Sequence, residues 1–216
     1  MNKDDKINFL CKLTGRCCIH NQVILNPLDI FNISNYLEIP SKYLFKKKIL
    51  TYIINKSDYW MDPMINIGKE NICPFLISPN EKEFLCEIHE ARPTVCRIFP
   101  LNFNYNTEKF KFVKSSQQRC KECFDNNESL SIDDFIKSSD LENRFIFQKD
   151  YRSFINYIID SGYTIEKIKN NELKQMNFFK IQTILYETYP PQFNRTDTFP
   201  WDDIKQEIKD IIEFEN

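Results

Sequence analysis

The stretch CKLTGRCC, residues 11–18, places three cysteines within eight residues. Cys17 and Cys18 are adjacent, Cys11 precedes them, and Gly15 is one of only three glycines in the chain. Because glycine adopts backbone angles that other residues avoid, we expect Gly15 to bend the chain so that the thiols face inward. Since adjacent side chains project in different directions, we do not expect Cys17 and Cys18 to bind the same metal ion.

The cysteines are confined to the front of the chain. None follows Cys123, although the chain has 216 residues. This asymmetry predicts a cysteine-cluster module over residues 1–127 and a helical C-terminal layer over residues 128–216. The eight cysteines are Cys11, Cys17, Cys18, Cys73, Cys86, Cys96, Cys120 and Cys123.

Composition limits the classes of function. The net charge is −2 with scattered basic residues, which argues against a nucleic-acid partner, and the three glycines form no phosphate-binding loop.

The sequence has no apolar run that is long enough for a signal peptide or a membrane span, so we expect no membrane partner and a cytoplasmic location. A reducing cytoplasm disfavours disulfides, so clustered cysteines there indicate metal ligands or redox groups. The sequence does not indicate whether the protein is a monomer or an oligomer.

Hydrophobic spacing predicts an α+β fold that is predominantly α-helical, in which short strands and hairpins carry a cysteine-rich metal centre. Asn26 is expected to cap a helix that has Pro27 in its first turn, and Ser131 is expected to cap another. We expect Pro190-Pro191 to end a helix. The expected helices cover residues 26–37, 40–55, 141–159, 171–189 and 200–214, and a further helix is expected to start at Ser131. The expected strands lie within 74–88 and 101–115.

Four segments supply the thiols: CKLTGRCC, ICPFL, LCEIHEARPTVCRIFP and RCKEC. A soft metal prefers thiolates, and one short loop rarely reaches all corners of a tetrahedron. Arg92 and Arg97 flank the turn of Cys96, and such cations lower the pKa of nearby thiols. Because eight cysteines exceed the four that one zinc or one [4Fe–4S] cluster needs, the chain has thiols for two sites, or for ligands plus reactive groups.

The segments from Phe9 to Cys123 resemble the YkgJ-type cysteine-cluster family, the CxxCxxCC zinc- or iron-chelating domain. Its pattern is roughly C-x-x-C-G-x-C-C, then C-x-F-L, then C-x-I-Y-E-x-R-P-x-x-C-R-x-F-P, then a later cysteine. The run from Arg92 to Pro100 is the most specific part. The resemblance implies metal ligands at Cys11, Cys17, Cys18, Cys73, Cys86, Cys96 and Cys120.

The chain departs from the family pattern at two positions. Thr14 stands where the family has a cysteine, and His89 stands where tyrosine is usual. Cys123 is an alternative to Cys120 as the late ligand, and it would replace the missing thiol if the two cysteines came close together. Asp29 corresponds to the aspartate that follows the adjacent pair in the family.

Flagellin lysine N-methylase carries a similar domain. That resemblance implies an iron–sulfur cluster, 4Fe-4S in type, and S-adenosylmethionine-linked methyl transfer to a protein or peptide substrate. The first hypothesis is therefore a metal-binding protein, with zinc or a cluster, that modifies proteins. The alternative is a non-enzymatic structural zinc module that acts through protein–protein contacts.

His20 and His89 are each expected to be a surface or core histidine and not a metal ligand. Trp60 and Trp201 are expected to be packing anchors.

Overall fold

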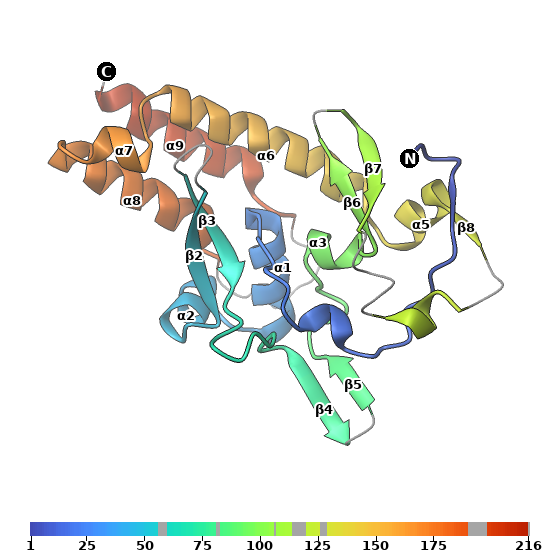
Figure 1. Cartoon of the computed structure of the whole chain (residues 1–216). Coiled ribbons are helices and arrows are strands. Elements are labelled where there is room, and N and C mark those ends of the chain that lie inside the picture. Colours follow the sequence, from blue (N-terminus) through green and yellow to red (C-terminus); the bar gives the residue numbers. More distant parts are fainter. Residues whose placement is uncertain are drawn as a thin grey trace. The chain divides into compact units, whose positions relative to one another are not determined.

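A computed structural model describes residues 1–55, 60–80, 83–105, 107–113, 120–125, 129–189 and 198–215. The chain divides into two compact units, each made of two separated segments (Figure 1). Unit 1 comprises Met1–Val23 and Asn66–Ile146, and unit 2 comprises Ile24–Ile65 and Phe147–Asn216. The boundary at residues 127 and 128 that the sequence predicts lies outside the described residues, so it stays a prediction.

Unit 1 contains short antiparallel strand pairs and short helices. β4 (Leu76–Asn80) pairs with β5 (Glu83–Cys86), and β6 (Leu101–Asn104) pairs with β7 (Lys109–Phe112), as the sequence predicts. β1 pairs with β8, which joins the two chain segments of this unit. Its remaining elements are β1 (Lys6–Ile7), η1 (Arg16–Cys18), α3 (Thr94–Arg97), η2 (Lys121–Cys123), β8 (Leu130–Ser131) and α5 (Ile132–Ser138).

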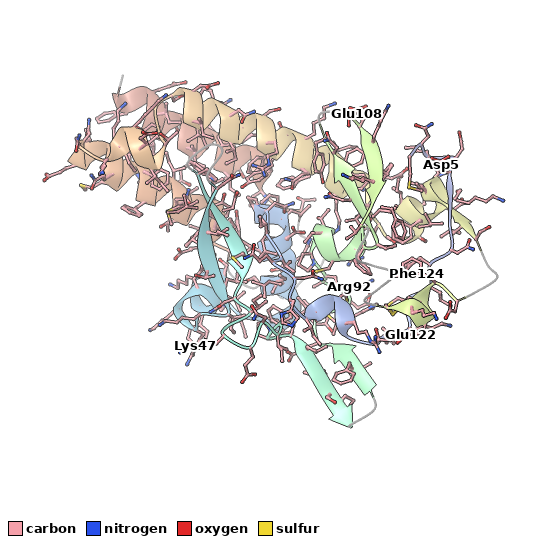
Figure 2. The ribbon with its side chains drawn as sticks, viewed as in Figure 1. Asp5, Lys47, Arg92, Glu108, Glu122 and Phe124 are labelled. Carbon is pink, nitrogen blue, oxygen red and sulfur yellow. A yellow bond between two sulfur atoms is a disulfide. The ribbon has the colours of Figure 1, made fainter. Side chains whose placement is uncertain are left out.

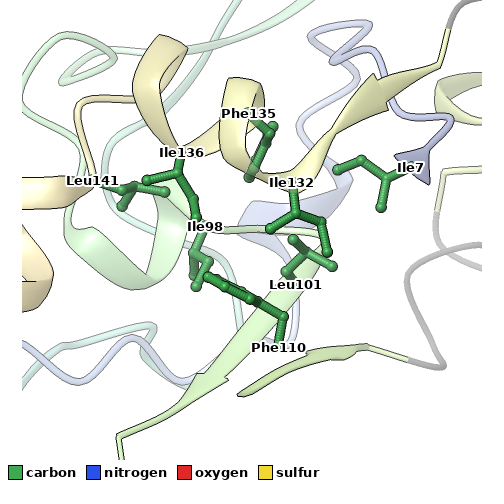
Figure 3. Packing of buried hydrophobic residues seen from close by; sticks show 8 residues of the cluster. All are labelled: Ile7, Ile98, Leu101, Phe110, Ile132, Phe135, Ile136 and Leu141. Carbon is green, nitrogen blue, oxygen red and sulfur yellow. The ribbon is translucent and has the colours of Figure 1, made fainter. Parts of the chain in front are cut away.

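A hydrophobic core holds the elements of unit 1 together (Figure 3). Burying one such aliphatic or aromatic side chain stabilises a fold by about 1.5–3 kcal/mol. Ile98 directly follows α3, so the core also fixes the helix that carries Cys96. The buried residues are Ile7, Ile98, Leu101, Phe110, Ile132, Phe135, Ile136 and Leu141.

Unit 2 is mainly helical and also contains the hairpin of β2 (Leu50–Asn55) and β3 (Trp60–Ile65). α1 begins with the predicted cap, since the Asn26 side chain accepts a hydrogen bond from the Asp29 amide. Trp60 is fully buried and donates its indole N–H to the Tyr186 hydroxyl over 3.2 Å, which confirms it as a packing anchor. The helices are α1 (Pro27–Leu37), α2 (Ser41–Lys46), α6 (Glu142–Asp160), whose first residues belong to unit 1, α7 (Ile165–Ile168), α8 (Glu172–Tyr186) and α9 (Trp201–Glu215).

The α+β class is confirmed, but the single helix expected over residues 40–55 is wrong. α2 ends at Lys46, Lys48 takes a positive φ of 58°, and the chain continues as β2. The β-branched residues of this stretch favour a strand, and they have β3 as a partner. The proline pair expected to end α8 lies outside the described residues. None of the helices that the structure describes combines the length and apolar character that crossing a bilayer requires.

Candidate metal centre

The adjacent cysteines lie on η1, a single 3₁₀ turn that begins after Gly15. Gly15 has a φ of +66°, which confirms the predicted bend, but Cys11 is exposed, so the expectation that its thiol faces inward is wrong. A Cβ at this position would lie 2.6 Å from Cβ of Phe84 and 2.8 Å from Cδ1 of Leu76. The lack of a side chain therefore lets η1 approach the hairpin of β4 and β5.

Three thiols from two distant segments meet at this turn. The Sγ atoms of Cys17 and Cys18 lie 3.9 Å apart, and the Cys18 thiol is hydrogen-bonded to the Cys73 thiol. The backbone amide of Cys73 also donates to the carbonyl of Cys18 over 2.8 Å. The expectation that Cys17 and Cys18 point apart is wrong, because each thiol turns about its own χ1 angle and the two sulfurs rotate towards each other.

Cys86 is the fourth thiol of this region. It is the last residue of β5, and it pairs in register with Leu76, whose amide donates to the carbonyl of Cys73 over 3.0 Å. The charges of Cys73 and Cys17 act on the Cys86 thiol. We call Cys17, Cys18, Cys73 and Cys86 the thiol group.

Hydrogen bonds and burial give the thiols of the thiol group different pKa values. The hydrogen bond from Cys18 lowers the pKa of Cys17 to about 7, and the same donor lowers the pKa of Cys73. The pKa of Cys18 is raised, because its proton is shared with both neighbours. Burial raises the pKa of Cys86 to about 11. At neutral pH, Cys17 and Cys73 are therefore the thiols that most readily become thiolates, the form that binds metals.

The two arginines that flank Cys96 have different roles. The positive charge of Arg92, labelled in Figure 2, contributes to the lowered pKa of Cys17, as the sequence predicts. Arg97 instead donates hydrogen bonds to the carbonyls of Glu90, Arg92 and Ser139. Arg97 thus fixes the turn before α3.

Cys120 and Cys123 form a second sulfur site. They are joined by a disulfide, whereas the sequence predicted that disulfides would be disfavoured and that Cys120 would bind a metal. The two-residue spacing on η2 brings their Cα atoms to 5.3 Å, which is within the usual range for a disulfide. In this oxidised form the pair offers no thiolate. Thr14 lies against it, with Oγ1 3.3 Å from Sγ of Cys120.

The other predicted site residues are spread more widely. Cys11 is exposed, Cys96 is half-buried on α3, and neither is part of the Cys120–Cys123 disulfide. The structure leaves the assignment of both as metal ligands a prediction. His20 is exposed, and Nδ1 of His89 lies 3.5 Å from the neighbouring Glu90 carboxylate. These surroundings are those of surface histidines.

Asp29, the residue matched to an aspartate of the family, has a structural role in this chain. It is buried in unit 2 at the start of α1. Its carboxylate accepts a hydrogen bond from the Asn26 amide and its own amide donates to the Asn26 side chain, so the two residues form a capping box.

The donor atoms of the thiol group fit a thiophilic metal. In a tetrahedral zinc site with Zn–S bonds of about 2.3 Å, two sulfurs lie about 3.8 Å apart. The 3.9 Å between Cys17 and Cys18 matches this separation. Over the described ranges, however, no three His, Cys, Asp or Glu side chains stand together as a preformed metal-binding group.

A cavity beside this region was not predicted from the sequence. Its volume is about 380 Å³, and its lining brings together two cations, one carboxylate, a hydroxyl and three apolar side chains. No spacing or motif marks it, because its walls come from three separate segments. The lining residues are Lys12, Leu13, Thr14, Arg16, Phe84, Leu85 and Glu122.

Comparison with known proteins gives one match. The sequence model of the CxxCxxCC family, described as "Putative zinc- or iron-chelating domain", matches residues 10–123, which is more than half of the chain. No curated protein and no solved structure was found to match the chain. The matched segment contains every thiol of the thiol group, and it also contains η1, β4, β5, α3, β6, β7 and η2 of unit 1, so the match and the geometry concern the same part of the molecule.

Proposed function

Because the chain belongs to the CxxCxxCC family of zinc- or iron-chelating domains, we propose that it binds zinc or iron through the thiol group of Cys17, Cys18, Cys73 and Cys86. The observation that carries the proposal is the meeting of Cys17, Cys18 and Cys73 across two distant segments. Two of these three thiols, Cys17 and Cys73, have a lowered pKa, which favours the thiolate form that binds metals.

Each thiol has a separate part in this proposal. Cys17 and Cys73 enter as thiolates, and Cys18 gives up the proton that it shares with them. Cys86 lies within electrostatic reach of both and is the fourth donor. Cys11, Cys96 and a reduced Cys120 complete the predicted ligand set and extend the same proposal. When bound, zinc would supply folding free energy, whereas an iron–sulfur cluster would supply one-electron transfer.

Metal analysis and a visible spectrum of anaerobically purified protein test this proposal. We expect stoichiometric zinc or iron, with a loss of most of the metal in Cys17→Ser, Cys18→Ser and Cys73→Ser variants that remain folded. Cys11→Ser tests the extended ligand set separately, because Cys11 is exposed and lies outside the thiol group. Full metal content in the three variants would show that the thiol group is not the site.

The identity of the cofactor defines two versions of the function. A coloured protein with iron and acid-labile sulfide would support an iron–sulfur cluster, 4Fe-4S in type. Protein-lysine N-methylation with S-adenosylmethionine as the methyl donor is the enzymatic version of the proposal, and it rests on the resemblance alone. Its test is methyl transfer from labelled S-adenosylmethionine to a lysine-containing protein or peptide. A colourless protein without iron excludes the cluster.

The alternative is a structural zinc module that acts through protein–protein contacts. The observation in its favour is that the thiol group joins η1 to the β4–β5 hairpin, two parts of unit 1 that are distant in sequence. A metal that joins such segments stabilises the folded state directly. This version predicts stoichiometric zinc and a loss of folded structure on chelation. A metal-free protein that unfolds cooperatively would contradict it.

A further inference from the structure

The Cys120–Cys123 disulfide lies next to the cavity, and the two share residues. Thr14 lines the cavity and places its hydroxyl 3.3 Å from Sγ of Cys120. Glu122, labelled in Figure 2, also lines the cavity and lies between the two cysteines in sequence. Because a disulfide sulfur carries no proton, the Thr14 hydroxyl is the donor in this contact.

The lining of the cavity indicates the chemistry of a ligand. Lys12 and Arg16 contribute two positive charges and Glu122 one negative charge, so the lining has a positive balance. Arg16 and Glu122 form an ion pair at 3.5 Å on the rim, where both side chains are about half exposed. A volume of about 380 Å³ is large enough for a small organic molecule. These features favour an anionic molecule of low molecular weight.

We propose that the cavity binds an anionic low-molecular-weight thiol, and that this thiol reduces the Cys120–Cys123 disulfide. Both cysteines are only 3% exposed, so a reductant must reach them along a defined path. Thr14 is the lining residue that contacts Sγ of Cys120, so we place this path at the Thr14 side chain. The proposal is independent of metal binding at the thiol group.

The reaction consists of two thiol–disulfide exchanges. The ligand thiolate attacks Sγ of Cys120, a mixed disulfide forms, and Cys123 leaves as a thiolate that takes a proton from water. A second ligand thiolate attacks the ligand sulfur of the mixed disulfide, and Cys120 leaves as a thiolate that accepts the Thr14 hydrogen bond. Two ligand thiols are oxidised to one disulfide, and the protein disulfide gains two electrons.

The test compares glutathione, an anionic thiol, with 2-mercaptoethanol, a neutral thiol, on oxidised protein under anaerobic conditions. The measurement is the initial rate at which Cys120 and Cys123 become available for alkylation, mapped by mass spectrometry. Lys12→Gln with Arg16→Gln removes both cavity cations. Lys109→Gln with Lys111→Gln is the matched control, since these exposed lysines of β7 lie outside the cavity and carry the same charge.

In the cavity variant we expect the glutathione rate to fall by about fivefold or more, because the attraction between ligand and cavity is lost. The rate with 2-mercaptoethanol should stay within about twofold, and the control variant should match the wild type with both thiols. An equal fall with both thiols would show that the charge of the attacking thiol does not matter, and it would overturn the proposal. So would an unchanged glutathione rate, or free thiols at Cys120 and Cys123 in protein purified in air.

Discussion

Cys17 shows at the residue scale how a neighbour sets the chemistry of a thiol. Its pKa is lowered to about 7 chiefly by the hydrogen bond from Cys18, and Arg92 assists through its charge. A thiolate reacts with iodoacetamide and a protonated thiol does not. In reduced, metal-free protein we therefore expect the alkylation rate of Cys17 to rise with pH and to reach half of its maximum near pH 7.

Two variants at position 18 test whether the hydrogen bond from Cys18 is what lowers the pKa of Cys17. Cys18→Ala removes the donor, so the midpoint for Cys17 should rise towards the ordinary thiol pKa of 9.0. Cys18→Ser keeps an O–H donor, so its midpoint should stay near that of the wild type. If the alanine variant also has its midpoint near 7, the hydrogen bond is not the cause.

Gly15 offers a second test at the residue scale. Gly15→Ala should lower the free energy of unfolding by about 3–4 kcal/mol, because an added Cβ meets Phe84 and Leu76 in a left-handed conformation. Gly68→Ala is the control, since Gly68 has a φ of +59° but no heavy atom within 4 Å of an added Cβ. We expect Gly68→Ala to cost only about 1 kcal/mol in urea unfolding. Equal losses in the two variants would exclude the close packing of η1 as the reason.

At the element scale, α8 contains a buried polar group that its neighbours do not satisfy. Gln182 is 3% exposed, and among the described residues neither its amide nitrogen nor its amide oxygen has a hydrogen-bond partner. Gln182→Met should therefore raise the free energy of unfolding by about 1–3 kcal/mol, because it removes an unsatisfied group at similar volume. Gln175→Met should be neutral or destabilising, since Gln175 donates to the carbonyls of Ile168 and Lys169. A destabilised Gln182→Met variant would mean that the amide has a role.

The element scale is also where the sequence was most informative. Caps and alternating patterns are local, so Asn26, Ser131 and the two hairpins of unit 1 could be predicted from their immediate neighbours. The error over residues 40–55 arose because pairing with β3 decides between helix and strand, and pairing partners are not local. The thiol group also depends on contacts between distant segments, whereas the disulfide joins two cysteines close in sequence and was missed because a reducing compartment was expected. The cysteine content predicted a metal centre, but not which thiols meet.

At the scale of the whole molecule, the division into two units allows each unit to be followed by its own measurement. Trp60 and Trp201, the two tryptophans of the chain, belong to unit 2, whereas the thiol group belongs to unit 1. If the metal stabilises unit 1, its removal by a chelator should leave tryptophan emission nearly unchanged. Hydrogen exchange should at the same time speed up in residues 66–105. Loss of the native tryptophan emission together with unit 1 would show that the two units unfold as one.

The interleaved order of the two units has a consequence for synthesis on the ribosome. Cys17 and Cys18 leave the ribosome before the whole segment Ile24–Ile65, which belongs to unit 2, and only then does Cys73 follow. At about 5–20 residues per second, the growing chain carries these two thiols without their partner for several seconds. During that interval the adjacent pair is open to oxidation or to capture by any thiophilic ion. The time for which Cys17 and Cys18 remain exposed in the nascent chain is therefore set by how quickly the segment that contains Cys73 is synthesised.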